Sequence, residues 1–151
     1  MAIVRAETEG PQILLGSSMG GLFSPPGFAA YAATKHALEA IAEAMQEELK
    51  PFGVEVQTIN PGAYLTGFNE AMAENAFRWL DDASNFTKQD MMRGMANGLI
   101  GNEQGRLDPS DMIAKMIEVI PASRGKFRNI HPEVVEDSLK SHQAAMFQRE
   151  I

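Results

Sequence analysis

The chain has 151 residues, enough for one domain with a buried core, and its 44% hydrophobic and 22% charged content is ordinary for a globular protein. A net charge of −7, with no run of lysine and arginine, argues against nucleic acid or an anionic membrane surface as a partner. No apolar run reaches the roughly 20 residues of a membrane span, and without cysteine there is no disulfide and no thiolate metal site. These features fit a cytoplasmic protein.

The first half of the chain predicts a strand, a helix and a second strand. Residues 12–16 are apolar on both faces of a pleat and predict a short buried strand. Apolar residues recur at three and four positions over about 28–50, which predicts a helix that Pro51 ends. Residues 54–59 predict the second strand, closed by Asn-Pro-Gly at 60–62. Strand, helix and strand with short connections are typical of a right-handed parallel βαβ unit, so we expect an α/β fold.

The second half of the chain predicts mostly helices. The firmest one has Asp108 as its N-cap and Pro109 at its first position, and Pro121 ends it. The other segments are a helix over 69–80, a helix-and-loop excursion over 84–104, a short strand over 126–131 and a last amphipathic helix over 132–148. No internal repeat or linker is visible, so we expect a single domain over residues 1–151.

The loop that follows the first predicted strand is rich in glycine and serine, as many phosphate-binding loops are. A phosphate-binding loop leads straight into a helix, because the free N–H groups of the helix N-terminus hold the phosphate. Here Gly20-Gly21 is followed by Leu-Phe-Ser-Pro-Pro-Gly before any helix can begin. The loop also lacks both the dinucleotide pattern and the Gly-Lys-Ser/Thr pattern. We conclude that it does not hold a phosphate.

A tyrosine, a lysine and a serine around this loop suggest acid–base chemistry instead. Tyr31 and Lys35 are four residues apart on the predicted helix, so their side chains share a face. A free phenol has a pKa of about 10, and a nearby ammonium favours its phenolate form. Ser18 stands thirteen residues before Tyr31, at the end of the strand, where its hydroxyl could bind a substrate oxygen.

This combination closely resembles the short-chain dehydrogenase/reductase family. Ser18 is followed at the family's spacing by Tyr31-Ala-Ala-Thr-Lys35, and Asn60-Pro61-Gly62-Ala-Tyr-Leu-Thr66 follows the next strand. Tyr-x-x-x-Lys alone arises by chance in many proteins, but the whole set is specific. The resemblance is clear from residue 12 to 66 and vaguer beyond. It implies a Rossmann-like doubly wound parallel sheet, of which this chain would be the helix-rich C-terminal portion.

The resemblance also implies roles for single residues. Tyr31 would donate a proton to a substrate carbonyl or take one from an alcohol, and Ser18 would orient the substrate oxygen. Lys35 would favour the phenolate and hydrogen-bond the nicotinamide ribose of NAD or NADP. The residues bordering the nicotinamide would be Pro61, Gly62 and the backbone near Tyr64, with Thr66 reaching toward the carboxamide or the phosphates. Residues 67–107 would form a lid over the small-molecule carbonyl or alcohol substrate, and no metal is implied.

The chain departs from the family at its N-terminal side. The family's first strand, its glycine-rich pyrophosphate loop and the residue that selects NAD or NADP would all precede Met1. The strand at 12–16 would then lose a neighbour, which leaves an unpaired edge and an uncovered apolar face. We therefore expect this chain alone to bind nicotinamide dinucleotides weakly or not at all.

For several of these residues a simpler, non-catalytic interpretation also remains open. Ser18 could merely close the strand with a turn, as Ser17 could, although the spacing favours Ser18 as the functional one. Metal spacing is absent among His36, His131 and His142, and Glu39, Glu43, Glu47 and Glu48 are predicted to form a solvated helix face. The methionines around 91–95 could line an apolar pocket or simply fill the core. The alanine stripe of the helix is interpreted as core or as a dimer contact, and the resemblance implies a homodimer or homotetramer.

Three functions remain in competition. The first is an oxidoreductase whose other half is absent from this chain. The second is a truncated, non-enzymatic relative that keeps these residues by descent and acts only through protein contacts. The third is a different chemistry on the same fold, since some relatives are epimerases or dehalogenases; Lys35, rather than arginine, argues against dehalogenation.

Overall fold

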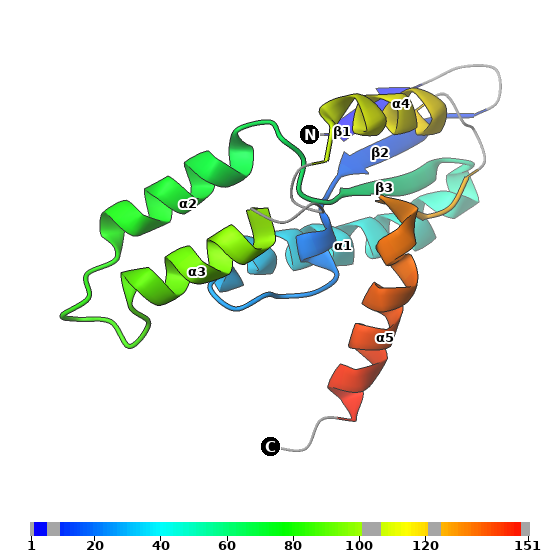
Figure 1. Cartoon of the computed structure of the whole chain (residues 1–151). Helices are drawn as coiled ribbons and strands as arrows, with labels where there is room; N and C mark the ends of the chain where they lie inside the picture. The colour runs from blue at the N-terminus through cyan, green and yellow to red at the C-terminus, as the bar shows by residue number, and fades with distance from the viewer. Residues whose placement is uncertain (1, 6–9, 101–106, 121–124, 149–151) are drawn as a thin grey trace. The chain divides into compact units, whose positions relative to one another are not determined.

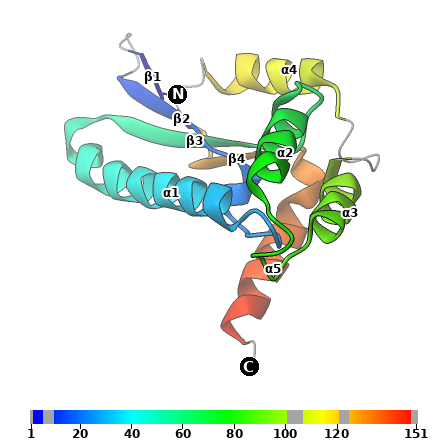
Figure 2. The same ribbon diagram turned by 90° about the vertical axis from the view of Figure 1, so that its left-hand side faces the viewer.

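The computed structural model describes residues 2–5, 10–100, 107–120 and 125–148. The chain divides into two compact units, Met1–Gly62 with Ile113–Ile151, and Ala63–Met112. Figures 1 and 2 together label the α-helices and strands of both. The predicted lid region, 67–107, lies within the second unit.

A sheet of four strands forms the centre of the first unit, in the order β1-β2-β3-β4. The strands are β1 (Ala2–Arg5), β2 (Gln12–Gly16), β3 (Glu55–Pro61) and β4 (Arg128–His131). β2, β3 and β4 run parallel, with Leu15 beside Thr58 and Ile59 beside Asn129. The predicted strands at 12–16, 54–59 and 126–131 are thus present, and the parallel β2-α1-β3 unit is confirmed.

β1 corrects the prediction that the β2 edge lacks a neighbour. Residues 2–5 pair antiparallel with β2, Ala2 beside Leu15 and Arg5 beside Gln12. A segment of four residues is too short to show the periodic apolar pattern that predicts a strand. The open edge of β2 presents unpaired N–H and C=O groups, which a short segment satisfies by adding to the sheet.

The helix α1 (Ala29–Leu49) covers one face of this sheet. It contributes Ala42, which is fully buried, to a cluster with Leu15 of β2 and Val56 of β3. Figures 1 and 2 both show α1 on one side of the strands and α4 on the other. The sequence predicted α1 to within a residue at each end, because Pro51 and Gly53 stop the helix.

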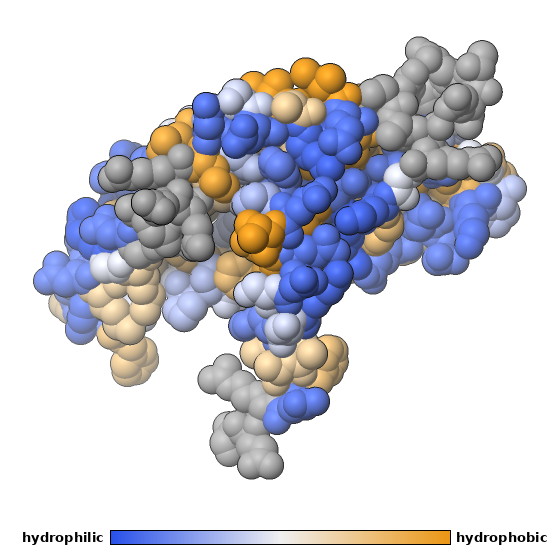
Figure 3. Space-filling model, turned by 45° about the vertical axis from the view of Figure 1, so that its right-hand side comes forward, coloured by the Kyte–Doolittle hydropathy of each residue, from blue (hydrophilic) through white to orange (hydrophobic). Residues whose placement is uncertain are grey.

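The helix α4 (Pro109–Val119) begins as predicted. The Asp108 side chain accepts a hydrogen bond from the Ser110 N–H at 2.9 Å, which is the expected N-cap. Pro121, predicted to end the helix, lies outside the described residues. Ile113 and Ile117 are more than half exposed on α4, and apolar side chains gather along the upper edge of Figure 3, where this helix lies.

The C-terminal segment folds back on the loop after β2. The predicted helix over 132–148 begins as a 3-10 turn, η4 (Glu133–Val135), and continues as α5 (Glu136–Phe147). Leu139 of α5 packs in one cluster with Leu22 and Ile130. The Gln143 side chain donates a hydrogen bond to the Leu22 carbonyl at 3.0 Å. These contacts anchor the end of the loop that contains Ser18.

The second unit contains the helices α2 (Phe68–Trp79) and α3 (Gln89–Ile100). Both fall where the sequence predicted helices. The connection between them is held by Asp82, whose side chain accepts the Gln89 N–H at 2.7 Å. An isolated parallel bridge joins Tyr64 to Leu107.

Candidate active site

Ser18 lies just beyond the carboxyl end of β2, where the chain turns toward α1. It is the N-cap of the 3-10 turn η1 (Met19–Gly21), and its Oγ accepts the Gly20 N–H at 3.1 Å. A hydroxyl has one hydrogen and two lone pairs, so this bond uses a lone pair and leaves the hydrogen to donate. The sequence favours such a turn because serine is a strong N-cap residue and two glycines follow it.

Lys35 joins α1 to the end of β2. Its Nζ donates hydrogen bonds to the carbonyl oxygens of Gly16 and Ser17, each at 3.3 Å. The same Nζ lies 5.8 Å from the centre of the Tyr31 ring. An ammonium carries three hydrogens, so two are used here and one remains for another acceptor. The predicted pairing of Tyr31 and Lys35 on one helix face is therefore present in the structure.

The Tyr31 ring and the Ser18 hydroxyl meet at Gly20. A Cβ added to Gly20 would lie 2.9 Å from Tyr31 Cε1 and 3.6 Å from Ser18 Oγ. The phenol ring and the hydroxyl therefore flank a space that any side chain at position 20 would fill. Ser18, Tyr31 and Lys35 lie together, as the sequence predicted.

Pro61 and Gly62 lie at the carboxyl end of β3, on the same edge of the sheet as Ser18. The Gly62 N–H donates to the His131 carbonyl at 2.9 Å. A Cβ added to Gly62 would lie 3.3 Å from the Met19 side chain. Because Met19 follows Ser18 directly, the Pro-Gly turn borders the candidate site.

Tyr64 and Thr66 belong to the second unit. Tyr64 is buried, and its burial together with Asp111 raises the pKa of its phenol to about 12. Thr66 is exposed, and its hydroxyl accepts the Phe68 N–H at 3.4 Å. The roles of these two residues toward a cofactor stay predictions.

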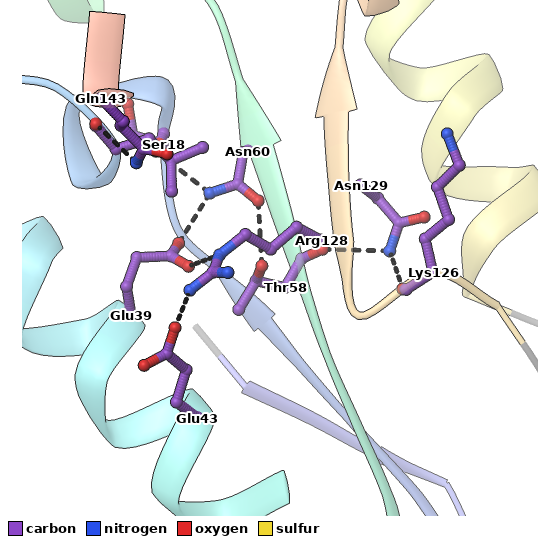
Figure 4. A network of polar contacts seen from close by, with 10 residues as sticks. Ser18, Glu39, Glu43, Thr58, Asn60, Lys126, Arg128, Asn129 and Gln143 are labelled. Atoms are coloured by element: carbon purple, nitrogen blue, oxygen red, sulfur yellow. Dashed lines mark hydrogen bonds and ion pairs between the residues drawn. The ribbon is translucent and has the colours of Figure 1, made fainter. Parts of the chain in front are cut away.

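Sequence reasoning missed a polar network beneath Ser18, shown in Figure 4. Glu39 was predicted to be solvated with the other glutamates of the helix, and this is wrong because its side chain is buried between Asn60 and Arg128. Glu43, Glu47 and Glu48 are exposed as predicted. No spacing signal separates Glu39 from the others, because positions 31, 35, 39, 43 and 47 all recur every four residues along the helix.

Comparison with known proteins identifies the family. The sequence profile described as short chain dehydrogenase matches residues 2–76. The chain is 46% identical over 59 residues to the uncharacterized oxidoreductase YbbO of Escherichia coli K12, which is 39% of this chain and 22% of that protein. It is 38% identical over 77 residues to the uncharacterized oxidoreductase YusZ of Bacillus subtilis, covering 51% and 24% of the two chains.

Solved structures show the same fold. A short chain dehydrogenase/reductase from Burkholderia phymatum, solved in complex with NAD, matches with a TM-score of 0.67 at 22% identity, over 93% of this chain and 50% of that one. The chain belongs to the short-chain dehydrogenase family. Its fold is the Rossmann-like α/β fold of that family, and it spans about half the length of the solved dehydrogenase.

The described residues of this dehydrogenase relative show neither a metal-binding cluster nor a membrane-spanning helix. Among them, no group of three histidine, aspartate or glutamate side chains could hold a metal ion. None of the helices in the described part of the chain is long and apolar enough to cross a membrane.

Proposed function

We propose that this chain contributes the catalytic part of a nicotinamide-dependent oxidoreductase that interconverts a small-molecule carbonyl and an alcohol. The observation that carries the proposal is the meeting of the Ser18 hydroxyl and the Tyr31 ring at Gly20, with the Lys35 ammonium 5.8 Å from the ring centre. An acid, a hydrogen-bond donor and a fixed positive charge are the groups that carbonyl reduction requires around one oxygen.

In the direction of reduction, the Tyr31 phenol donates its proton to the substrate oxygen as negative charge develops there. The Ser18 hydroxyl donates a hydrogen bond to the same oxygen, because its lone pair is already engaged by the Gly20 N–H. The phenolate that remains on Tyr31 is stabilised by the nearby positive charge of Lys35. Oxidation of an alcohol reverses these steps, with the phenolate taking the proton.

The residues of the first unit fit the nicotinamide end of NAD or NADP. The remaining N–H of Lys35 suits a ribose hydroxyl, and Pro61 with Gly62 forms the border of the site beside Met19. When bound, the nicotinamide would give a hydride to the carbonyl carbon or take one from the alcohol. We extend the proposal to Tyr64 and Thr66 as cofactor contacts and to residues 67–107 as a substrate lid.

The α1 helix also suggests association between copies of the chain. Ile41 is about half exposed, and the alanines at 37, 40 and 44 on this helix are exposed as well. We propose a homodimer or homotetramer through this face. The same face is what a non-enzymatic relative would use for protein contacts, so only a chemical assay separates the two functions.

The decisive assay is deuteride transfer from NADPH or NADH labelled at the transferable position, with a panel of aliphatic and aromatic ketones. Mass spectrometry of the product alcohols detects single turnovers at high protein concentration, which suits weak cofactor binding. We expect labelled alcohol from the wild-type chain. In Tyr31→Phe the yield should fall by at least about a hundredfold, because the general acid is lost.

Neighbouring serines provide a matched control. Ser18→Ala should lower the transfer roughly a hundredfold, because a hydrogen bond to the developing oxyanion is lost. Ser17 is buried and its Oγ has no hydrogen-bond partner among the described residues, so Ser17→Ala should stay within about twofold of wild type. No labelled product from wild type, or full activity in Tyr31→Phe, would contradict the proposed function.

A further inference from the structure

Glu39 is a buried carboxylate on the helix face that carries the candidate catalytic residues. It follows Lys35 by one helical turn, and it is only 4% exposed. Both of its oxygens are engaged: Oε1 accepts from Asn60 Nδ2 at 2.6 Å, and Oε2 accepts from Arg128 Nε at 3.0 Å. A buried charge is tolerated only when it is paired and hydrogen-bonded in this way. Arg128 supplies the compensating charge and also pairs with Glu43.

Asn60 connects this carboxylate to the loop above it. Its side chain is fully buried, and Nδ2 donates one hydrogen bond to Glu39 and another to the Ser18 carbonyl at 3.2 Å. Its Oδ1 accepts from the Thr58 hydroxyl at 2.9 Å. Because a carboxylate and a carbonyl can only accept, the amide nitrogen must face them, which fixes the orientation of the amide. Figure 4 shows this connection from Arg128 to Ser18.

The Ser18 carbonyl is the point at which the network reaches the site. It accepts hydrogen bonds from Asn60 and from the Gly21 N–H, which lies 3.0 Å away. The Gly21 backbone itself lies against α1, since a Cβ there would meet Glu39 Cγ at 2.9 Å and the Lys35 carbonyl at 3.0 Å. Fixing the backbone of Ser18 fixes the point from which its hydroxyl reaches the space beside Gly20 that the Tyr31 ring also borders.

We propose that Glu39 and Asn60 are positioning residues, which hold Ser18 in place relative to Tyr31 and Lys35. The proposal rests on the proposed function, because it assigns the network a purpose in orienting the group that binds the substrate oxygen. A purely structural role would make the Glu39–Asn60 pair matter for stability alone. A variant that loses the hydrogen bond from Asn60 to the Ser18 carbonyl but keeps the Glu39–Asn60 pair separates the two roles.

A swap of the pair tests this. In the double variant Glu39→Gln/Asn60→Asp the pair is rebuilt with donor and acceptor exchanged, because the new amide donates to the new carboxylate and accepts from Arg128. The aspartate, however, has no hydrogen to give to the Ser18 carbonyl. The single variant Asn60→Asp sets two carboxylates against each other. Glu43→Gln is the control, because Glu43 binds the same arginine from an exposed position.

Two readouts report on Ser18 and on the whole fold. Amide hydrogen exchange at Gly20 and Gly21, measured by NMR, follows the two N–H groups that Ser18 accepts; the Ala42 amide within α1 is the reference. Urea unfolding gives the stability of each variant. We expect the swap to recover most of the stability lost in Asn60→Asp. We also expect exchange at Gly20 and Gly21 to stay at least about tenfold faster than in wild type, relative to Ala42, as expected for a lost buried hydrogen bond.

Glu43→Gln should leave the exchange at Gly20 and Gly21 within about twofold of wild type, because an exposed ion pair contributes little. A swap variant with wild-type exchange at both glycines would overturn the proposal. If neither Asn60 variant folds, the same exchange at Gly20 and Gly21 is compared between Glu39→Gln and Glu43→Gln. Faster exchange in Glu39→Gln alone supports the proposal, and equal exchange in the two variants overturns it.

The exchange readout needs neither cofactor nor substrate, so failure of deuteride transfer in the wild-type chain contradicts the proposed function separately. In a chain with transfer, the swap should also lower it by at least about tenfold.

Discussion

The two tyrosines of the chain show how one residue type acquires different chemistry from its surroundings. Tyr31 is half-buried beside the Lys35 ammonium and the Ser18 hydroxyl. Tyr64 is buried in the second unit, where desolvation and the charge of Asp111 raise the pKa of its phenol to about 12. Burial and a nearby negative charge oppose ionisation of Tyr64, so Tyr31 is the tyrosine for which we propose a proton transfer.

The raised pKa of Tyr64 has a consequence at alkaline pH. The folded state holds this proton more tightly than the unfolded state, where the pKa is near 10.0. The resulting stability is complete below that pH and is lost as the pH rises toward 12. In the Tyr31→Phe variant Tyr64 is the only tyrosine left, so ultraviolet absorbance reports on it alone. We expect ionisation near pH 12 or together with alkaline unfolding; ionisation of the folded protein near pH 10 would contradict the burial of Tyr64.

At the scale of elements, the turn η1 depends on a close approach to α1. A Cβ at Gly21 would lie 3.0 Å from the Lys35 carbonyl oxygen and 3.0 Å from Ser17 Oγ. The Lys35 carbonyl belongs to the backbone of α1, so it cannot move aside without disturbing the helix that carries Tyr31 and Lys35. The glycine at position 21 is therefore required by space, not by its φ angle.

The substitution Gly21→Ala should destabilise the protein by about 1–3 kcal/mol, as overpacking of a well-packed region does. Gly94→Ala is the matched control, since a Cβ at this position of α3 meets nothing within 4 Å. Alanine favours a helix over glycine, so this variant should gain up to about 1 kcal/mol. Urea unfolding at equilibrium measures both changes. Equal stability of the two variants would contradict the close packing of η1 on α1.

Local sequence patterns predicted most of these elements. The β2-α1-β3 unit was visible because an apolar run, a three-and-four repeat and the Pro-Gly turn each act over a few neighbouring residues. β1 was not visible, because its formation depends on the open edge of β2. Glu39 was misjudged for a similar reason: its partner Arg128 lies 89 positions along the chain. Spacing within a helix cannot reveal a charge that the fold brings from a distant strand.

At the scale of the whole molecule, the residues proposed for chemistry divide between the two units. Ser18, Tyr31, Lys35, Pro61 and Gly62 were predicted from the sequence and lie in the first unit. Their meeting could be predicted because the carboxyl ends of parallel strands share one edge of a sheet. Tyr64 and Thr66 lie in the second unit, and the sequence motif alone assigns them to a cofactor. We therefore base the proposed nicotinamide site on the residues of the first unit.

An NMR titration of the labelled chain with NADPH and NADH tests this proposed site most directly. Our account predicts weak binding, with a dissociation constant on the order of a millimolar, and the largest shifts at the backbone amides of Ser18, Lys35 and Gly62. Lys35→Met should abolish these shifts, because the ammonium that suits the ribose is lost. Largest shifts at other residues, or shifts that Lys35→Met leaves unchanged, would contradict a nicotinamide site at the carboxyl ends of β2 and β3.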